Sequence, residues 1–330
     1  MPLPLLVRPF AAAMEDVKTQ GSWWQRATGV LAFVIVLLLM PLGHTLMVLM
    51  EQVFGHAVFA SALVVGAIGI GLLWWGVARP GRDLYATLLG AIAGVLVWTG
   101  WVEFSFVWLA GKLGVQPLME NGEVVTKPEY LVMLSSIGLL GTMLMLYIFS
   151  HTRCPFFNWF QKRMGLFKKL AIPTASQRPL AMIAFMEMVM LIWTFYLVLL
   201  VVYDDQIAGD RHPATWIVAF GSLAWSLYLF TKLLRIKSFD HAVRYAVPTV
   251  VIFWNFVEII GRWGLLHEIW VHPFEHWVEN SLILSFFLGA TVYYVIKGRK
   301  DRNRRIRSTP AGKASAGMAS RSKGHAAVGF

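Results

Sequence analysis

Residues 27–50 read ATGVLAFVIVLLLMPLGHTLMVLM, a stretch with no aspartate, glutamate, lysine or arginine. An α-helix rises 1.5 Å per residue, so about 20 apolar residues cross the ~30 Å hydrocarbon core of a bilayer. A soluble domain would bury such a helix only at the centre of a large core. The same pattern recurs along the chain, which indicates that these stretches face lipid.

Seven further apolar stretches of similar length follow the first. The predicted spans are 27–50, 57–78, 85–111, 130–150, 180–203, 214–234, 243–266 and 278–297. Hydrophobic residues make up 57% of the chain and charged residues 14%, whereas soluble domains carry about 25% charged residues. The predicted fold class is therefore an all-α integral membrane protein, a bundle of about eight transmembrane helices in contact with the lipid bilayer. The first two spans lie close enough in sequence to form a helical hairpin.

Basic residues gather in every second loop. Clusters of Lys and Arg follow the second, fourth, sixth and eighth spans, and acidic residues dominate the loops between them. Because cytoplasmic loops carry an excess of Lys and Arg, the pattern predicts a multi-pass protein of the cell inner membrane with both termini in the cytoplasm. Membrane orientation also explains the net charge of +11 better than nucleic acid does, so no nucleic-acid partner is expected.

The chain divides into a cytoplasmic N-terminal segment, 1–26, a transmembrane domain, 27–297, and a disordered basic cytoplasmic tail, 298–330. The cytoplasmic loop near 152–178 mixes aromatic and basic residues, which predicts an amphipathic helix on the membrane surface. Asn121-Gly122, between short apolar and acidic stretches, predicts a small β-hairpin in an outer loop. A membrane or periplasmic protein partner remains open.

The third and seventh spans carry related polar residues. The third contains Gly100-Trp101-Val102-Glu103, and the seventh contains Asn255-Phe256-Val257-Glu258. Each span also begins near an Asp and a Tyr-Ala pair. These matches predict two four-helix repeats in the same orientation, with Glu103 and Glu258 at one depth. Chance resemblance between apolar segments is the alternative.

Carboxylates within membrane spans are candidates for function, because inserting one costs roughly 2.5–3.5 kcal/mol. Glu103 and Glu258 are the candidates here, as groups that bind and release protons or cations. The alternative is a structural ion pair with Arg262, one turn after Glu258. Tryptophans favour a belt at the membrane interface, although Trp98, Trp101 and Trp254 could form a substrate or cofactor box.

Five of the histidines on the predicted outer side are candidate ligands, because imidazole with carboxylate suits copper, iron or zinc, or an axial position on haem b. The predicted metal ligands are His44, His56, His267, His272 and His276. We expect at least three of them to approach one another. Residues that support these ligands or form an ion path are Glu103, Glu258, Glu51, Glu268, Glu275 and Arg262. An interfacial belt of polar rings is the alternative.

Three functions follow from these residues. The first is membrane redox chemistry or metal handling at an outer metal or haem site. The second is a proton- or cation-coupled transporter or channel that uses Glu103 and Glu258. The third is a non-catalytic subunit of a membrane complex. The chain has no phosphate-binding loop and no nucleophile elbow, which disfavours a nucleotide hydrolase and a serine hydrolase. Whether the protein is an enzyme stays open.

Overall fold

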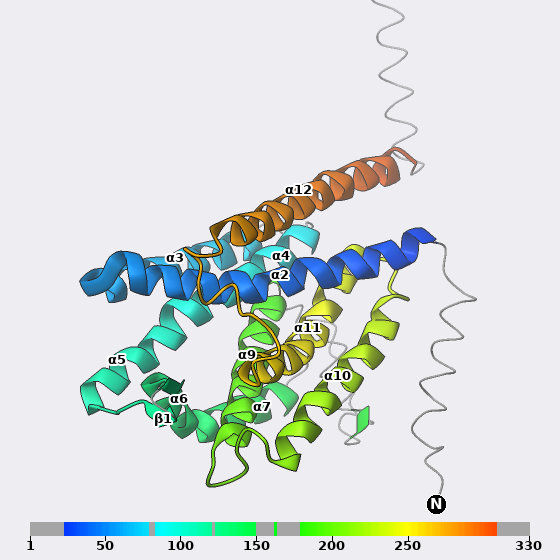
Figure 1. Ribbon diagram of the computed structural model, residues 1–330. Coiled ribbons are helices and arrows are strands. Elements are labelled where there is room, and N and C mark those ends of the chain that lie inside the picture. Colours follow the sequence, from blue (N-terminus) through cyan, green and yellow to red (C-terminus); the bar gives the residue numbers. More distant parts are fainter. Residues whose placement is uncertain (1–22, 79–82, 121–122, 150–161, 164–178, 309–330) are drawn as a thin grey trace, which may run out of the picture. The chain divides into compact units, whose positions relative to one another are not determined.

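The computed structural model describes residues 23–78, 83–120, 123–149, 162–163 and 179–308 (Figure 1). Nearly all of these residues are helical. The elements are α2 (Trp23–Phe54), η1 (Gly55–Ala57), α3 (Val58–Val77), α4 (Asp83–Val97), η2 (Trp98–Glu103), α5 (Phe104–Leu113), β1 (Leu118–Glu120), β2 (Glu123–Thr126), α6 (Pro128–Met133), η3 (Leu134–Ser136), α7 (Ile137–Phe149), α9 (Leu180–Tyr203), α10 (Pro213–Leu233), α11 (Phe239–Arg262) and α12 (Trp277–Ser308). The chain divides into two units, Met1–Leu284 and Ser285–Phe330, with the boundary inside α12.

Six stretches of the described chain are long and apolar enough to cross a membrane. They are Ala27–Val77, Leu84–Leu113, Pro128–Leu146, Leu180–Tyr203, Pro213–Leu233 and His241–Arg262. The first holds two helices, α2 and α3, so the predicted class of multi-pass helical protein is confirmed. The predicted number of eight is not confirmed, because the eighth span, 278–297, lies in α12, which is not among these six stretches.

α2 and α3 form a helical hairpin. Gly55 in the connecting turn η1 has a φ of +45°, a conformation that glycine adopts without the steric penalty of other residues. Met47 and Met50, near the end of α2, pack with Ala62, near the start of α3. The hairpin that the short connection between the first two spans suggested is therefore present.

α4, η2 and α5 follow one another without a break in the helical chain. η2 is a π-helical turn, a feature that often marks functional sites within α-helices. Gly100 in this turn lies against α3, since a Cβ at Gly100 would come within 2.6 Å of the Gly66 nitrogen and 2.7 Å of the Ala62 oxygen. Only glycine allows the two backbones to approach so closely.

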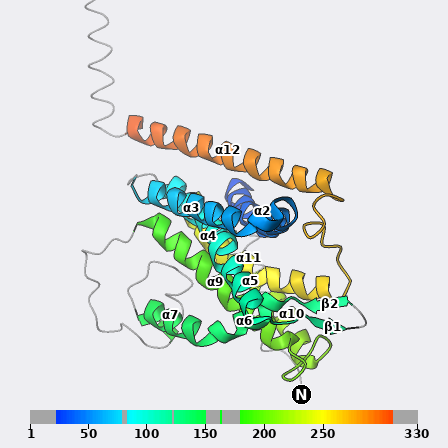
Figure 2. The same cartoon turned by 90° about the vertical axis from the view of Figure 1, so that its left-hand side faces the viewer.

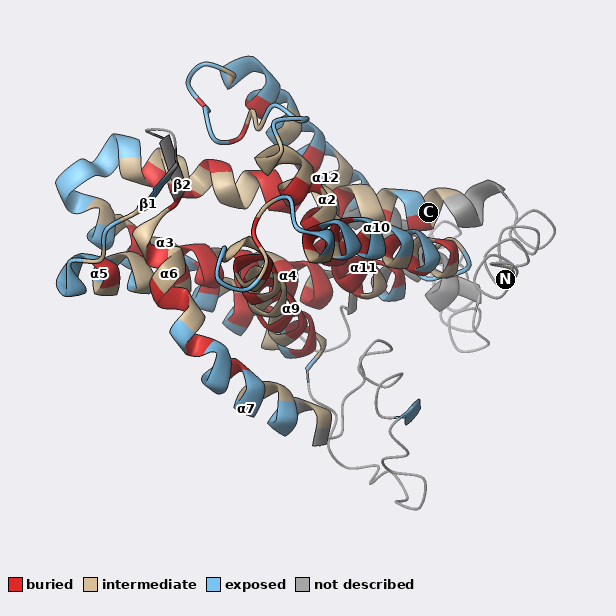
Figure 3. Ribbon diagram, turned by 60° about the horizontal axis from the view of Figure 1, so that its bottom comes forward, coloured by how far each residue is buried: buried red, intermediate tan, exposed pale blue. Residues whose placement is uncertain are grey.

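The centre of the first unit is built around α4 and α11. α4 packs against α3 and α9, whereas α11 packs against α10 and α2. Buried residues concentrate on α4, α9 and α11 (Figure 3). The exposed side chains of α3 and α10 are largely apolar, as Trp74 and Ile217 illustrate with 76% and 71% exposure. Such surfaces suit contact with lipid.

This packing is the pattern that two crossed repeats would give. In that case α2, α3 and α4 correspond to α9, α10 and α11. α4 packs against α3 of its own half and α9 of the other half, and α11 packs against α10 of its own half and α2 of the other half. Superposition of the two halves, with Glu103 over Glu258, stays a prediction.

The remaining sequence predictions have mixed outcomes. The hairpin is present, as β1 pairs antiparallel with β2 between α5 and α6 (Figure 2). The amphipathic helix predicted at 152–178 falls almost wholly outside the described residues, as do 1–22 and 309–330. α12 continues through Ser308, so the first residues of the predicted disordered tail extend the helix instead.

Candidate functional site

A cavity of about 310 Å³ lies within the first unit, among α2, α4, η2, α6, α9 and α11. Its inner wall includes Leu39 and Val251, in the middle of α2 and α11, and Val95, near the end of α4. At the other extreme it reaches the connection between α11 and α12, residues 263–276, which we term the capping loop. Its charged lining residues are His44, Glu103, Glu258, Arg262 and Glu268, and its Trp and Tyr rings are Trp98, Tyr130, Tyr196, Tyr203, Trp254 and Trp270.

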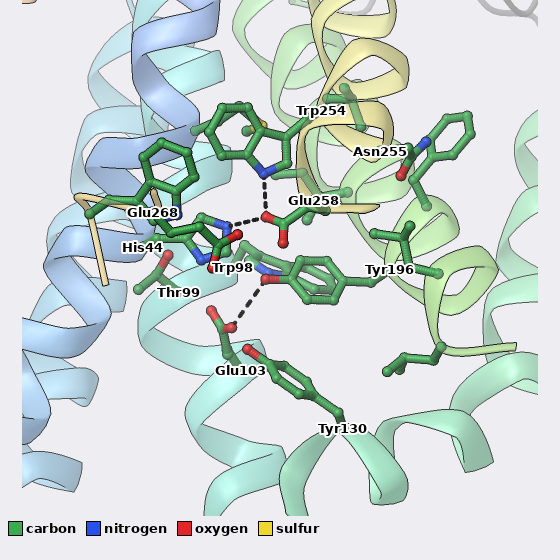
Figure 4. Close-up of a pocket in the computed structure, with 18 of the residues that line it drawn as sticks. His44, Trp98, Thr99, Glu103, Tyr130, Tyr196, Trp254, Asn255, Glu258 and Glu268 are labelled. Carbon is green, nitrogen blue, oxygen red and sulfur yellow. Dashed lines mark hydrogen bonds and ion pairs between the residues drawn. The ribbon is translucent and has the colours of Figure 1, made fainter. Parts of the chain in front are cut away.

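Glu258 of α11 is held by residues of two helices. His44 Nε2, on α2, lies 3.3 Å from Glu258 Oε1, close enough for the imidazole and the carboxylate to share a proton. Trp254 Nε1, one turn earlier on α11, donates a hydrogen bond of 2.5 Å to the same oxygen. The His44 and Trp254 rings lie face to face, with centroids 6.1 Å apart and planes 22° from parallel. The carboxylate therefore has a fixed orientation toward the cavity (Figure 4).

Glu103 lies at the end of the π-helical turn η2 and is only 3% exposed. Tyr196 on α9 donates from its hydroxyl to Glu103 Oε1 at 3.5 Å. Tyr130 on α6 points its hydroxyl toward the same carboxylate in Figure 4, and its ring centroid is 5.9 Å from that of Tyr196. The ring of Trp98, also in η2, lies 5.6 Å from that of Tyr196. Glu103 is thus placed among aromatic hydroxyls and rings.

The two carboxylates are bound crosswise between the halves of the chain. Glu258, in the second half, contacts His44 in the first, and Glu103, in the first half, contacts Tyr196 in the second. The cavity is therefore lined by residues from both halves of the chain.

The capping loop brings a third carboxylate to the cavity. Glu268 points toward the space beside Glu258 in Figure 4, and Gly261 leaves room for it, because a Cβ there would collide with the Glu268 carboxylate. Burial, followed by repulsion from Glu258, raises the pKa of Glu268 from 4.5 to about 7. Glu268 therefore exchanges its proton near neutral pH.

Asn280, at the start of α12, ties the capping loop to α2. Its Nδ2 donates to the carbonyl oxygens of Ile269 and His276, both at 2.9 Å, and its Oδ1 accepts from Thr45 Oγ1 at 3.0 Å. These bonds fix Trp270, whose ring lies 5.1 Å from that of Trp254. The loop is thus a structured part of the cavity wall.

Arg262 closes another side of the cavity. Its Nε donates to Asp210 Oδ1 at 2.6 Å, and its guanidinium lies 4.2 Å from the centre of the Tyr203 ring. Trp263 Nε1 donates to the backbone oxygen of Asp210 at 2.8 Å. The positive charge of Arg262 is therefore balanced by Asp210, a residue that the sequence did not single out.

Three polar atoms of the lining are buried and have no hydrogen-bond partner among the described residues. They are Trp98 Nε1, Tyr203 Oη and Asn255 Nδ2. Buried polar groups are nearly always satisfied in folded proteins.

The structure brings together only part of the predicted site. His44, Glu103, Glu258, Arg262 and Glu268 line one cavity. The other predicted residues lie elsewhere. Four are exposed, one in η1 and three in the capping loop: His56, His267, His272 and Glu275. His276 lies near Glu279, and Glu51 pairs with Lys127. Among the described residues, no three His, Cys, Asp or Glu side chains form a group that could hold a metal ion. The expected gathering of histidines is therefore not present there.

Sequence reasoning missed several lining residues. Tyr130, Tyr196, Tyr203 and Asn255 are polar groups within apolar spans, and that position was the signal that could have identified them. Of the tryptophan box, Trp98 and Trp254 line the cavity. The remaining member, Trp101, instead donates to the backbone oxygen of Leu63 at 3.1 Å.

Comparisons with protein-family models, with curated proteins and with solved structures found no match for this chain.

Proposed function

We propose that the protein moves protons or other cations across the membrane, with Glu103 and Glu258 as the groups that bind and release them. The observation that carries the proposal is that two carboxylates line one cavity, and each belongs to a stretch that is long and apolar enough to cross a membrane. Glu103 lies in Leu84–Leu113, and Glu258 lies in His241–Arg262. A charged side chain within a bilayer is costly, and such residues typically mark ion or substrate pathways.

The contacts of the carboxylates support exchange of a proton. Glu258 shares its Oε1 with His44 and Trp254, so a proton can reside on the imidazole or on the carboxylate. Glu103 accepts a long hydrogen bond from Tyr196, which a bound cation can replace without breaking a strong contact. Glu268 lies at the capping loop, where a carboxylate of pKa about 7 can pass protons to and from the solvent.

The experiment uses the full chain in proteoliposomes that enclose a pH-sensitive dye. A membrane potential is imposed, and the flux of protons is followed as the change in dye fluorescence. Glu103→Gln and Glu258→Gln keep the size of each side chain and remove its charge. Each is expected to lower the flux by about tenfold or more, because the group that carries the ion is gone.

Glu279→Gln is the matched control, since the Glu279 side chain is 53% exposed and does not line the cavity. The control should leave the flux unchanged. Normal flux in both cavity variants, or no flux above empty liposomes for the unaltered protein under any cation gradient, would refute the proposal.

The metal or haem site, the role as a non-catalytic subunit and the inner-membrane orientation stay predictions. Metal analysis and an optical spectrum of the detergent-purified protein test the first. A Soret band would indicate haem b, and stoichiometric copper, iron or zinc would indicate a metal site. Loss of that metal in a His272→Ala, His276→Ala double variant would assign it to the capping loop.

A further inference from the structure

The walls of the cavity combine acidic and aromatic groups. Trp98, Tyr130 and Tyr196 form one run of neighbouring rings, with centroid separations of 5.6 and 5.9 Å. Trp254 and Trp270 form a second, with centroids 5.1 Å apart. The faces of such rings carry partial negative charge and attract cations, most strongly in a desolvated site. A pathway for protons alone requires no such surface.

The charge of the lining also favours a cation. Glu103, Glu258 and Glu268 contribute three carboxyl groups, against which stand His44 and Arg262. Arg262 is bound to Asp210, which lies outside the lining. His44 is paired with Glu258, which leaves Glu103 and Glu268 without a basic partner in the lining, so a cation is attracted to them and an anionic ligand is repelled.

The volume of the cavity and the spacing of its carboxylates favour an organic cation over a metal ion. Its volume is about 310 Å³, at the lower end of the roughly 300–1,000 Å³ typical of small-molecule sites. The carboxylates are distributed around it, and within the described chain no three ligating side chains converge on one point. A metal ion needs such convergence, but an extended organic ion does not.

We infer that the cavity binds a small organic ammonium ion. The ammonium group lies between the carboxylates and the Trp254–Trp270 pair. This inference rests on the proposed function in that it names the class of cation for the same cavity.

The test is calorimetric titration of the purified full-length protein with defined probes. Choline, ethanolamine and tetramethylammonium are the cations, and 3,3-dimethyl-1-butanol is the uncharged shape analogue of choline. The three cations should bind through their charge and the faces of the aromatic rings, whereas the uncharged analogue should bind about tenfold more weakly or not at all. Failure of all three cations to bind, or equal binding of the uncharged analogue, would overturn the inference.

Variants locate the binding. Trp270→Leu removes a ring and should weaken binding by about 2- to 30-fold, whereas Trp270→Phe should restore most of it. Trp74→Leu is the control, because Trp74 is 76% exposed on α3. Thermal unfolding of each variant verifies that it is folded. Unchanged affinity in a folded Trp270→Leu protein would contradict the aromatic site.

The two proposals can fail separately. If protons cross and depend on Glu103 and Glu258 while no ammonium ion binds, the inference is wrong and the proposed function stands. If choline binds and depends on Trp270 while no cation crosses the membrane, the ligand class stands and transport does not.

Discussion

Replacing Asn280 by alanine should release the capping loop from the cavity. Asn280 is only 8% exposed, and it makes three side-chain hydrogen bonds, to Ile269, His276 and Thr45. Each is worth about 1 kcal/mol net, so the closed loop loses about 3 kcal/mol, which multiplies the population of its open form by roughly a hundred. The loss is local, because the helices around the cavity retain their own contacts.

Hydrogen exchange followed by mass spectrometry measures that population. Amides of the capping loop that are protected in the unaltered protein should exchange roughly a hundredfold faster in Asn280→Ala, while amides of α4 and α11 should not change. Thr45→Val removes one of the three bonds and should accelerate exchange by about fivefold. Ser281→Ala, next to Asn280 and exposed, is the control. Equal loop protection in Asn280→Ala and the control would refute the loop's attachment through Asn280.

Three further predictions concern packing, pH and topology. Gly100→Ala should destabilise the protein by about 1–3 kcal/mol, because its Cβ would press on backbone atoms of α3. The melting temperature in detergent measures this. Gly71→Ala is the control and should not lower the melting temperature, because a Cβ at Gly71 meets nothing within 4 Å. Because the folded pKa of Glu268 is raised to about 7 from 4.5, its contribution to loop protection is complete below about pH 4.5 and lost as the pH rises through about 7. Hydrogen exchange at a series of pH values tests this, and Glu268→Gln should remove that dependence. A reporter fused after residue 300 should be active only in the cytoplasm, and one inserted near Asn121 only outside; the reverse pattern would overturn the predicted sidedness.

The sequence by itself determined the class of fold and the approximate limits of its helices. Apolar runs such as 27–50 are sufficient for this, because the thickness of a bilayer sets their length and backbone hydrogen bonding requires a helix. The π-helical turn at Trp98–Glu103 could not be predicted in the same way. Such turns are rare and occur mostly as single-turn bulges within α-helices, so packing against neighbouring helices, rather than a local residue pattern, decides where one forms.

The sequence also identified Glu103, Glu258 and His44, since polar groups in apolar spans are conspicuous. It could not decide which of them meet, because His44 and Glu258 are far apart in the chain and are joined only by the packing of α2 on α11. The same packing left His56, His267 and His272 exposed, although the sequence predicted them as metal ligands. The carboxylates, the tyrosines on α6 and α9 and the capping loop share one cavity only because α4 packs on α9 and α11 packs on α2, which no local pattern encodes.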